Sequence, residues 1–124
     1  MAKVLVVDDA AIMRINIKNM LEKMGHEVVA EADTGNKAVE QYKQAKPDFV
    51  TMDITMPEDN GVRDGISAVK KIKELDKKAK IIMVTSHGEQ QKVIKAIQSG
   101  ASNYVLKPIK FEKFEEVINK LVLS

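Results

Sequence analysis

The chain of 124 residues has no cysteine, no tryptophan and only two histidines, His26 and His87. Without cysteine it can form no disulfide and offers neither a thiol nucleophile nor a thiolate metal ligand. Two histidines also make a histidine-rich zinc site an unfavourable interpretation. A metal site in this chain should therefore use oxygen ligands.

An excess of charge of one sign and long apolar runs are absent as well. Twenty Lys and Arg against 18 Asp and Glu give a net charge of +2, without the basic footprint of a nucleic-acid binder. No apolar run approaches the ~20 residues of a membrane span, and no secretory signal follows Met1. We therefore expect a cytoplasmic protein that binds neither nucleic acid nor membranes.

What the sequence does contain is a regular alternation of two kinds of segment. Short apolar runs rich in β-branched residues predict strands, and continuous runs are typical of strands buried on both faces of a parallel sheet. Segments with apolar residues every three or four positions predict helices between them, the first ending at Gly25 and the second before Pro47. The predicted strands are Val4–Val7, Val28–Ala30, Phe49–Met52, Ile81–Val84 and Tyr104–Leu106. The apolar stripes of the helices span Met13–Met24, Val39–Ala45, Ile66–Ile72, Val93–Ile97 and Phe111–Leu121.

Five strand–helix repeats predict an α/β fold with an open five-stranded parallel sheet, doubly wound, with helices on both faces. A barrel would require eight repeats. At ~100–150 residues per domain, residues 1–124 should form a single domain. The one long loop is residues 58–65, which we expect to be solvated.

Polar residues stand where the predicted strands end. The first run is followed by Asp8–Asp9, the third by Asp53, the fourth by Thr85 and the fifth by Lys107. Each also has an ordinary structural explanation. Asp9 could cap a helix and Asp53 could form a turn. Thr85 could be a plain strand residue, and Lys107 could be a solvated surface charge. Because ligands bind beyond the carboxyl ends of parallel strands, their shared position favours one site instead.

Three carboxylates in one place repel one another unless cations balance them. An ammonium group and a hard divalent ion, Mg²⁺ above all, would do so with oxygen ligands only. A carboxylate nucleophile beside Mg²⁺ and Lys107 suits phosphoryl transfer onto aspartate, with Thr85 offering a hydroxyl. Asp53, which stands alone at the end of a strand, is the better acceptor, whereas Asp8 and Asp9 are suited to hold the cation.

These motifs, with Met56–Pro57 after Asp53 and Pro108 after Lys107, resemble the receiver domain of bacterial two-component response regulators. Without an output domain, the chain is most similar to the single-domain regulators of chemotaxis. The resemblance implies a sheet order of 2-1-3-4-5 and a cis peptide bond before Pro108. It also implies that Asp53 is the phosphoacceptor, that Asp9 binds Mg²⁺ directly and Asp8 through water, and that the main-chain carbonyl of Thr55 is a further ligand.

The resemblance further implies a switch. Thr85 would move toward the phosphoryl group and Tyr104 would swing inward, changing a surface that carries Lys92 and Lys95. The phosphoryl donor would be a sensor histidine kinase (CheA-like) or a small acyl phosphate. The target would be a protein such as a flagellar motor switch component, with a phosphatase as a further partner, and the domain would act as a monomer.

Three other functions stay open from the sequence. The chain could be a stand-alone phosphorelay intermediate, which needs the same residues. A Mg²⁺-dependent phosphohydrolase would usually carry a second aspartate two residues after the nucleophile, where Thr55 stands. A flavodoxin-like cofactor carrier is disfavoured, because two carboxylates after the first strand repel an anionic cofactor. Beyond these functions, His87, near Thr85, could influence hydrolysis of the phosphoryl group or be an ordinary surface residue.

Overall fold

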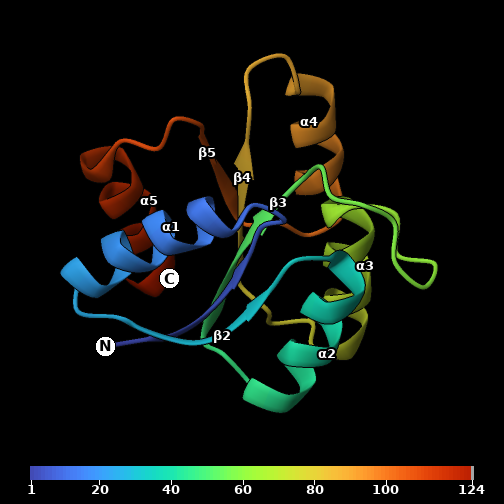
Figure 1. Ribbon diagram of the computed structural model, residues 1–124, viewed down its shortest axis with the longest axis horizontal. Coiled ribbons are helices and arrows are strands. Elements are labelled where there is room, and N and C mark those ends of the chain that lie inside the picture. The colour runs from blue at the N-terminus through green and yellow to red at the C-terminus, as the bar shows by residue number, and fades with distance from the viewer. Residues whose placement is uncertain (124) are drawn as a thin grey trace.

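The computed structural model describes residues 1–123, in which five strands alternate with five helices (Figure 1). The strands are β1 (Lys3–Val7), β2 (Glu27–Ala32), β3 (Phe49–Asp53), β4 (Ile81–Thr85) and β5 (Asn103–Leu106). The helices are α1 (Ala11–Lys23), α2 (Gly35–Ala45), α3 (Gly65–Leu75), α4 (Gln90–Gln98) and α5 (Phe111–Leu123). All four strand pairs are parallel and the order is β2-β1-β3-β4-β5, which confirms the predicted fold.

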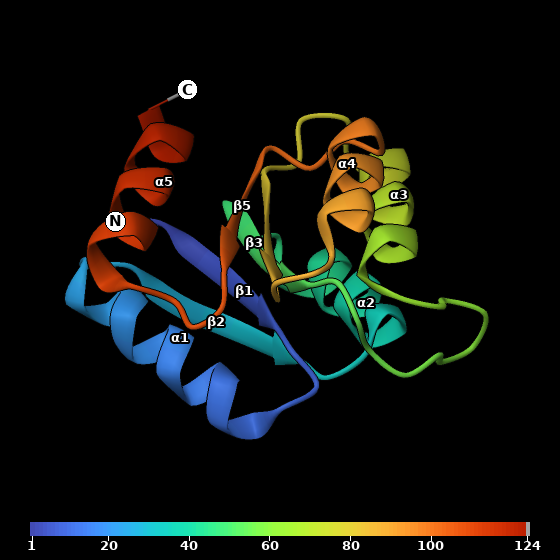
Figure 2. The same cartoon turned by 90° about the horizontal axis from the view of Figure 1, so that it is seen from above.

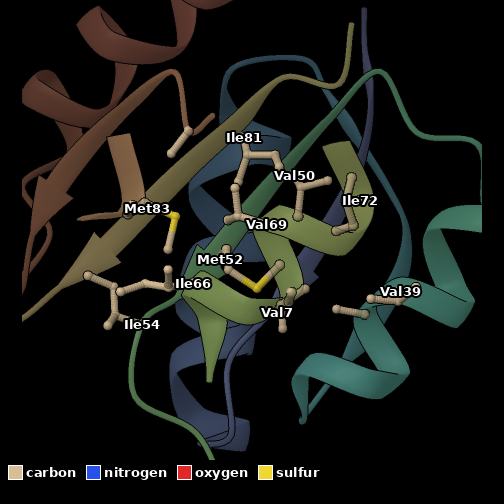
Figure 3. Close-up of a cluster of buried hydrophobic side chains, with 14 of the residues drawn as sticks. Val7, Val39, Val50, Met52, Ile54, Ile66, Val69, Ile72, Ile81 and Met83 are labelled. Carbon is tan, nitrogen blue, oxygen red and sulfur yellow. The ribbon is translucent and has the colours of Figure 1, made fainter. Parts of the chain in front are cut away.

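The sheet separates two helical layers, with α1 and α5 on one face and α2, α3 and α4 on the other (Figure 2). Successive residues of a strand point to opposite faces, and β1 follows this rule. Its Val4 and Val6 join the core under α1 and α5, whereas Leu5 and Val7 join the core under the other three helices. Figure 3 shows this second core, with Val7 beside Met52 of β3. A continuous apolar strand is therefore needed to fill both cores.

Only the central strands are buried throughout. Every residue of β3 and β4 is buried, and so is β1 after Lys3, as expected for strands covered on both faces. The outer strands β2 and β5 are half open, with Tyr104 and Leu106 each 42% exposed. Among residues 1–123, no helix combines the length and apolar character that crossing a bilayer requires.

The helix ends show which polar residues have a purely structural use. Thr34 caps α2 by accepting the Lys37 N–H at 3.1 Å, and Asp64 caps α3 by accepting the Ser67 N–H at 2.9 Å. The interpretation of Asp9 as the cap of the first helix is wrong, because the N-cap of α1 is Ala10 and no side chain caps it. The Asp9 carboxylate is therefore left for another use.

The long loop contains a tight turn. Asp59 and Val62 exchange two backbone hydrogen bonds of 3.1 and 3.0 Å around Asn60–Gly61, both with positive φ, as in a two-residue hairpin. Val62 is buried, and the Asp59 carboxylate accepts the Thr34 hydroxyl at 2.8 Å. The expectation of a solvated loop over residues 58–65 holds for its exposed tip at Asn60–Gly61 and is wrong for the buried Val62 and Gly65.

Candidate functional site

The predicted site residues meet at the carboxyl edge of the sheet. Asp8 follows β1, Asp53 and Thr85 are the last residues of β3 and β4, and Lys107 follows β5. The register places them side by side, because Asp53 pairs with Val84 and the Lys107 N–H donates to the Thr85 carbonyl at 2.7 Å. Because these strands are neighbours in the sheet, the residues at their carboxyl ends lie close together although they are far apart in the sequence.

Lys107 joins two of the carboxylates. Its Nζ lies 3.1 Å from Asp8 Oδ2 and 3.5 Å from Asp53 Oδ1. Burial alone would lower the pKa of Lys107, but the adjacent charge of Asp53 and the contact with Asp8 outweigh burial and raise it. The side chain is therefore an ammonium group at neutral pH. The Lys107–Pro108 peptide bond is cis, as the resemblance implied.

The carboxylates of Asp8, Asp9 and Asp53 form a cluster in which one oxygen from each lies within 4.8 Å of the others. Asp8 and Asp53 are buried and Asp9 is exposed. Burial first, and then the charges of Asp8 and Asp9, raise the pKa of Asp53 to about 7 against the opposing effect of Lys107. One ammonium group thus does not balance the cluster.

The cluster fits a hard divalent cation. Asp8 Oδ1 accepts the Ala10 N–H at 2.9 Å, whereas the buried Oδ2 has the ion pair with Lys107 but accepts no hydrogen bond within residues 1–123. Carboxylate oxygens without imidazole or thiolate are the donor set that Mg²⁺ prefers. Asp8, Asp9 and Asp53 are therefore suited to hold such an ion; Thr55, two residues beyond Asp53, is exposed.

Thr85 is fully buried and contacts a residue that the sequence analysis missed. Its hydroxyl lies 3.1 Å from Glu89 Oε1 and 3.4 Å from the Ser86 carbonyl. Glu89 also accepts the Thr55 hydroxyl at 2.7 Å and the Ser86 N–H at 2.8 Å. Burial would raise the pKa of Glu89, but these hydrogen bonds outweigh it and lower the pKa below its usual range.

A local signal for Glu89 exists in the sequence. Ser86-His87-Gly88-Glu89 has the S-x-x-E spacing of a capping box, in which the glutamate accepts the N–H of the first residue. The Ser86 N–H does donate to Glu89, but Glu89 is itself the N-cap of α4, so Ser86 does not begin the helix and the pattern is not a capping box. The bonds to Thr55 and Thr85 do not follow from it, because they depend on how two loops meet.

The predicted switch residues line one groove. It lies between α4 and β5, has a volume of ≈ 580 Å³, and is lined by Thr85, Val93, Tyr104 and Leu106 among others. The exposed Tyr104 ring is at its edge and exposed His87 at its rim. Both predicted lysines are exposed on α4, Lys92 with its Nζ 3.7 Å from Glu89 Oε2.

Residues 4–119 match the response regulator receiver domain. The chain belongs to this family. The receiver fold accounts for the strand order, and the family acts in two-component signalling, where a receiver is a switch rather than a conventional enzyme.

Several relatives of this receiver are named chemotaxis proteins. The chemotaxis protein CheY of Bacillus subtilis is 53% identical over 118 residues, which are 95% of each chain, and CheY of Thermotoga maritima is 49% identical over 96% of each. Among solved structures, CheY of Borrelia burgdorferi, in a complex with CheX, BeF₃ and Mg²⁺, has a TM-score of 0.90 and 31% identity. That match covers 98% of this receiver and 90% of the other chain.

Proposed function

We propose that this receiver is a switch operated by Mg²⁺-dependent phosphorylation of Asp53. The observation that carries the proposal is the position of the Lys107 ammonium, 3.1 Å from Asp8 and 3.5 Å from Asp53, within a cluster of three carboxylates. A cluster with excess negative charge suits a cation, and that cation together with the Lys107 ammonium can balance the negative charge of a phosphoryl group.

The transfer forms one bond and breaks one. An Asp53 carboxylate oxygen attacks phosphorus, and the bond to the donor breaks with its electron pair leaving on the phosphohistidine nitrogen or on the carboxylate of an acyl phosphate. The Lys107 ammonium stabilises the charge on the phosphoryl oxygens. Asp8, Asp9, Asp53 and the main-chain carbonyl of Thr55 would hold Mg²⁺, which supplies further positive charge to those oxygens when bound.

The site residues favour this switch over the alternatives. Thr55 stands where a phosphohydrolase would usually need its acid, and its hydroxyl is bonded to Glu89 instead. A flavodoxin-like carrier would place an anionic phosphate beside Asp8 and Asp9, which are better suited to a cation. A phosphorelay intermediate would use the same chemistry and would differ only in its partner.

Switching would connect Asp53 to the surface formed by α4, β5 and α5. Thr85 turns toward the phosphoryl group, and the ring of Tyr104 enters the space beside it in the groove. Lys110 and Lys113 line a second groove of ≈ 430 Å³ that also includes Tyr104, which suits an acidic target segment. A swing from 1:99 to 99:1 requires about 5.5 kcal/mol, which phosphorylation and the target would supply together.

The partners follow from this chemistry and from the relatives. The phosphoryl donor is a sensor histidine kinase, and the target is a component of the flagellar motor switch, as suits a protein similar to CheY. A phosphatase that binds the phosphorylated form is a further partner, because the Borrelia burgdorferi CheY was solved with CheX. The domain would work in the cytoplasm as a monomer.

Labelling with acetyl phosphate tests the proposal. We expect one hydroxylamine-labile phosphate per chain in the presence of Mg²⁺, little label without it, and none in the variant Asp53→Asn. The matched control is Asp33→Asn, because Asp33 follows β2 at the same edge but pairs with Lys37 at 3.1 Å. This control should label like the unmodified protein.

Two results would contradict the proposal. Stoichiometric label in Asp53→Asn would place the acceptor elsewhere, and rapid turnover of many phosphoesters would favour the phosphohydrolase.

Binding of an acidic peptide to α4, β5 and α5 is then compared between the labelled protein and its Tyr104→Ala variant. Equal binding by the two would exclude Tyr104 from the readout.

A further inference from the structure

The Glu89 carboxylate is the point where the loops after β3 and β4 meet. One oxygen, Oε2, accepts the Thr55 hydroxyl at 2.7 Å. The other, Oε1, lies 3.1 Å from the Thr85 hydroxyl and 2.8 Å from the Ser86 nitrogen. Thr55 and Thr85 are 30 positions apart in the sequence, so this one side chain connects two separate walls of the site.

A helix cap does not explain this arrangement. Glu89 is the N-cap residue of α4, and its side chain accepts none of the N–H groups of that helix. The carboxylate points back toward β4, where it accepts the Ser86 N–H, a group that precedes the helix and does not belong to it. The bonds to two threonine hydroxyls go beyond what the end of a helix needs.

We propose that Glu89 is an internal latch, which holds the Thr85 hydroxyl in the unphosphorylated position and competes with the phosphoryl group for it. The inference rests on the proposed function, because it concerns the same switch. It adds a residue whose carboxylate sets how difficult the switch is to operate. The Thr55 bond fixes that carboxylate in place from the opposite side.

The physical basis of the competition is the donor capacity of Thr85. A hydroxyl has one hydrogen to donate, so it can serve Glu89 or a phosphoryl oxygen but not both. A hydrogen bond to a carboxylate is stronger than a neutral one, and breaking it opposes the movement of Thr85. Removing the latch should therefore favour the switched state, with Tyr104 in the groove.

Beryllofluoride, a tetrahedral mimic of the phosphoryl group, measures this effect without any partner protein. The protein is labelled with fluorotyrosine, and the ¹⁹F signal of Tyr104 is followed while BeF₃⁻ is added at saturating Mg²⁺. We expect Glu89→Gln to lower the apparent dissociation constant about tenfold, equivalent to ~1.4 kcal/mol. Because the Glu89 side chain caps no N–H group of α4, this variant should keep the start of the helix.

Two comparisons separate the latch from a simple effect of charge. Glu58→Gln removes the same charge from the exposed loop after β3 and should change the constant less than about twofold. In a Thr85→Ala background the Glu89→Gln change should also have less than a twofold effect, because the hydroxyl under competition is gone. Equal shifts in the two backgrounds would overturn the latch.

The outcome distinguishes failure of the latch from failure of the proposed function. If BeF₃⁻ does not bind the unmodified protein, or binds Asp53→Asn equally well, the proposed function is wrong. If it binds the unmodified protein in an Asp53-dependent way but Glu89→Gln behaves like Glu58→Gln, only the latch is wrong. Glu89→Ala, which removes the acceptor entirely, should shift the constant at least as far as Glu89→Gln, and a smaller shift would count against the latch.

Discussion

The two edges of the sheet use aspartate in opposite ways. At the amino edge, Asp48 accepts the Lys3 N–H at 2.7 Å and Asp76 accepts the Tyr42 hydroxyl at 2.8 Å. At the carboxyl edge, Asp8, Asp9 and Asp53 lie together with the single ammonium group of Lys107. The hydrogen bond from Tyr42 is the main reason why the pKa of Asp76 is lowered, whereas burial raises that of Asp53 to about 7.

This difference separates stability from function within one small domain. A carboxylate that accepts hydrogen bonds stabilises the folded chain, because its charged form is favoured by folding. A buried carboxylate beside others of the same charge destabilises the folded chain until a proton or a cation relieves the repulsion. The amino edge is thus built for stability, and the carboxyl edge retains the capacity to bind and react.

The variant Asp53→Asn should produce the largest change, a stabilisation at pH 8 without metal. A pKa raised from 3.8 to about 7 means that ionised Asp53 costs the fold about 4 kcal/mol above that pH, to order of magnitude. In the unmodified protein, the folded state binds the Asp53 proton more tightly than the unfolded chain does, which stabilises the fold at low pH. This stabilisation is complete below the unfolded pKa and is lost as the pH rises through the folded pKa of about 7. Urea unfolding in EDTA from pH 5 to 8 should show that loss, and Asp53→Asn should nearly abolish it.

The amino edge provides the control for this prediction. Asp48→Asn makes the same chemical change where the carboxylate accepts the Lys3 N–H. It should destabilise the protein by up to ~1 kcal/mol, the opposite sign to Asp53→Asn. If both variants destabilise the protein at pH 8, the two edges do not differ in the way described.

Removing the ammonium group should have the second largest effect. Lys107→Met leaves Asp8 and Asp53 without their nearest cation, and we expect a loss of about 2 kcal/mol at pH 8 in urea unfolding. Lys120→Met is the matched control, since its ion pair with Glu116 is exposed on α5. That control should stay within ~0.5 kcal/mol, and a similar loss in both variants would show that Lys107 does not stabilise the cluster.

Much of this comparison could be predicted from the sequence, because it depends on topology. Apolar runs alternating with helical stripes define a parallel sheet, and such a sheet brings the residues after its strands to one edge. Asp8, Asp53, Thr85 and Lys107 could therefore be placed together without knowing any distance. The same reasoning gave the five helices with only small errors at their ends.

Other features could not be predicted, because they depend on how loops meet in space. The spacing from Ser86 to Glu89 suggests a capping box, whereas Glu89 is itself the N-cap of α4 and instead accepts the hydroxyls of Thr55 and Thr85. Asp59 looks like a residue of a solvated loop, although it begins a hairpin turn bonded to Thr34. Both cases involve a side chain that crosses between segments distant in the sequence.

The variant Tyr42→Phe should have the smallest effect and tests the amino edge alone. The buried ring stays, the hydrogen bond to Asp76 is lost, and we expect a loss of about 1 kcal/mol in urea unfolding at pH 7. Because the pKa of Asp76 is lowered in the folded protein, this stabilisation is present above the unfolded pKa and is lost as the pH falls through the folded one. The variant should therefore lose less stability on acidification than its parent. Tyr104→Phe, which changes an exposed ring, should stay within ~0.5 kcal/mol. Labelling by acetyl phosphate should be unchanged in Tyr42→Phe, and a reduced rate would show that the two edges are coupled.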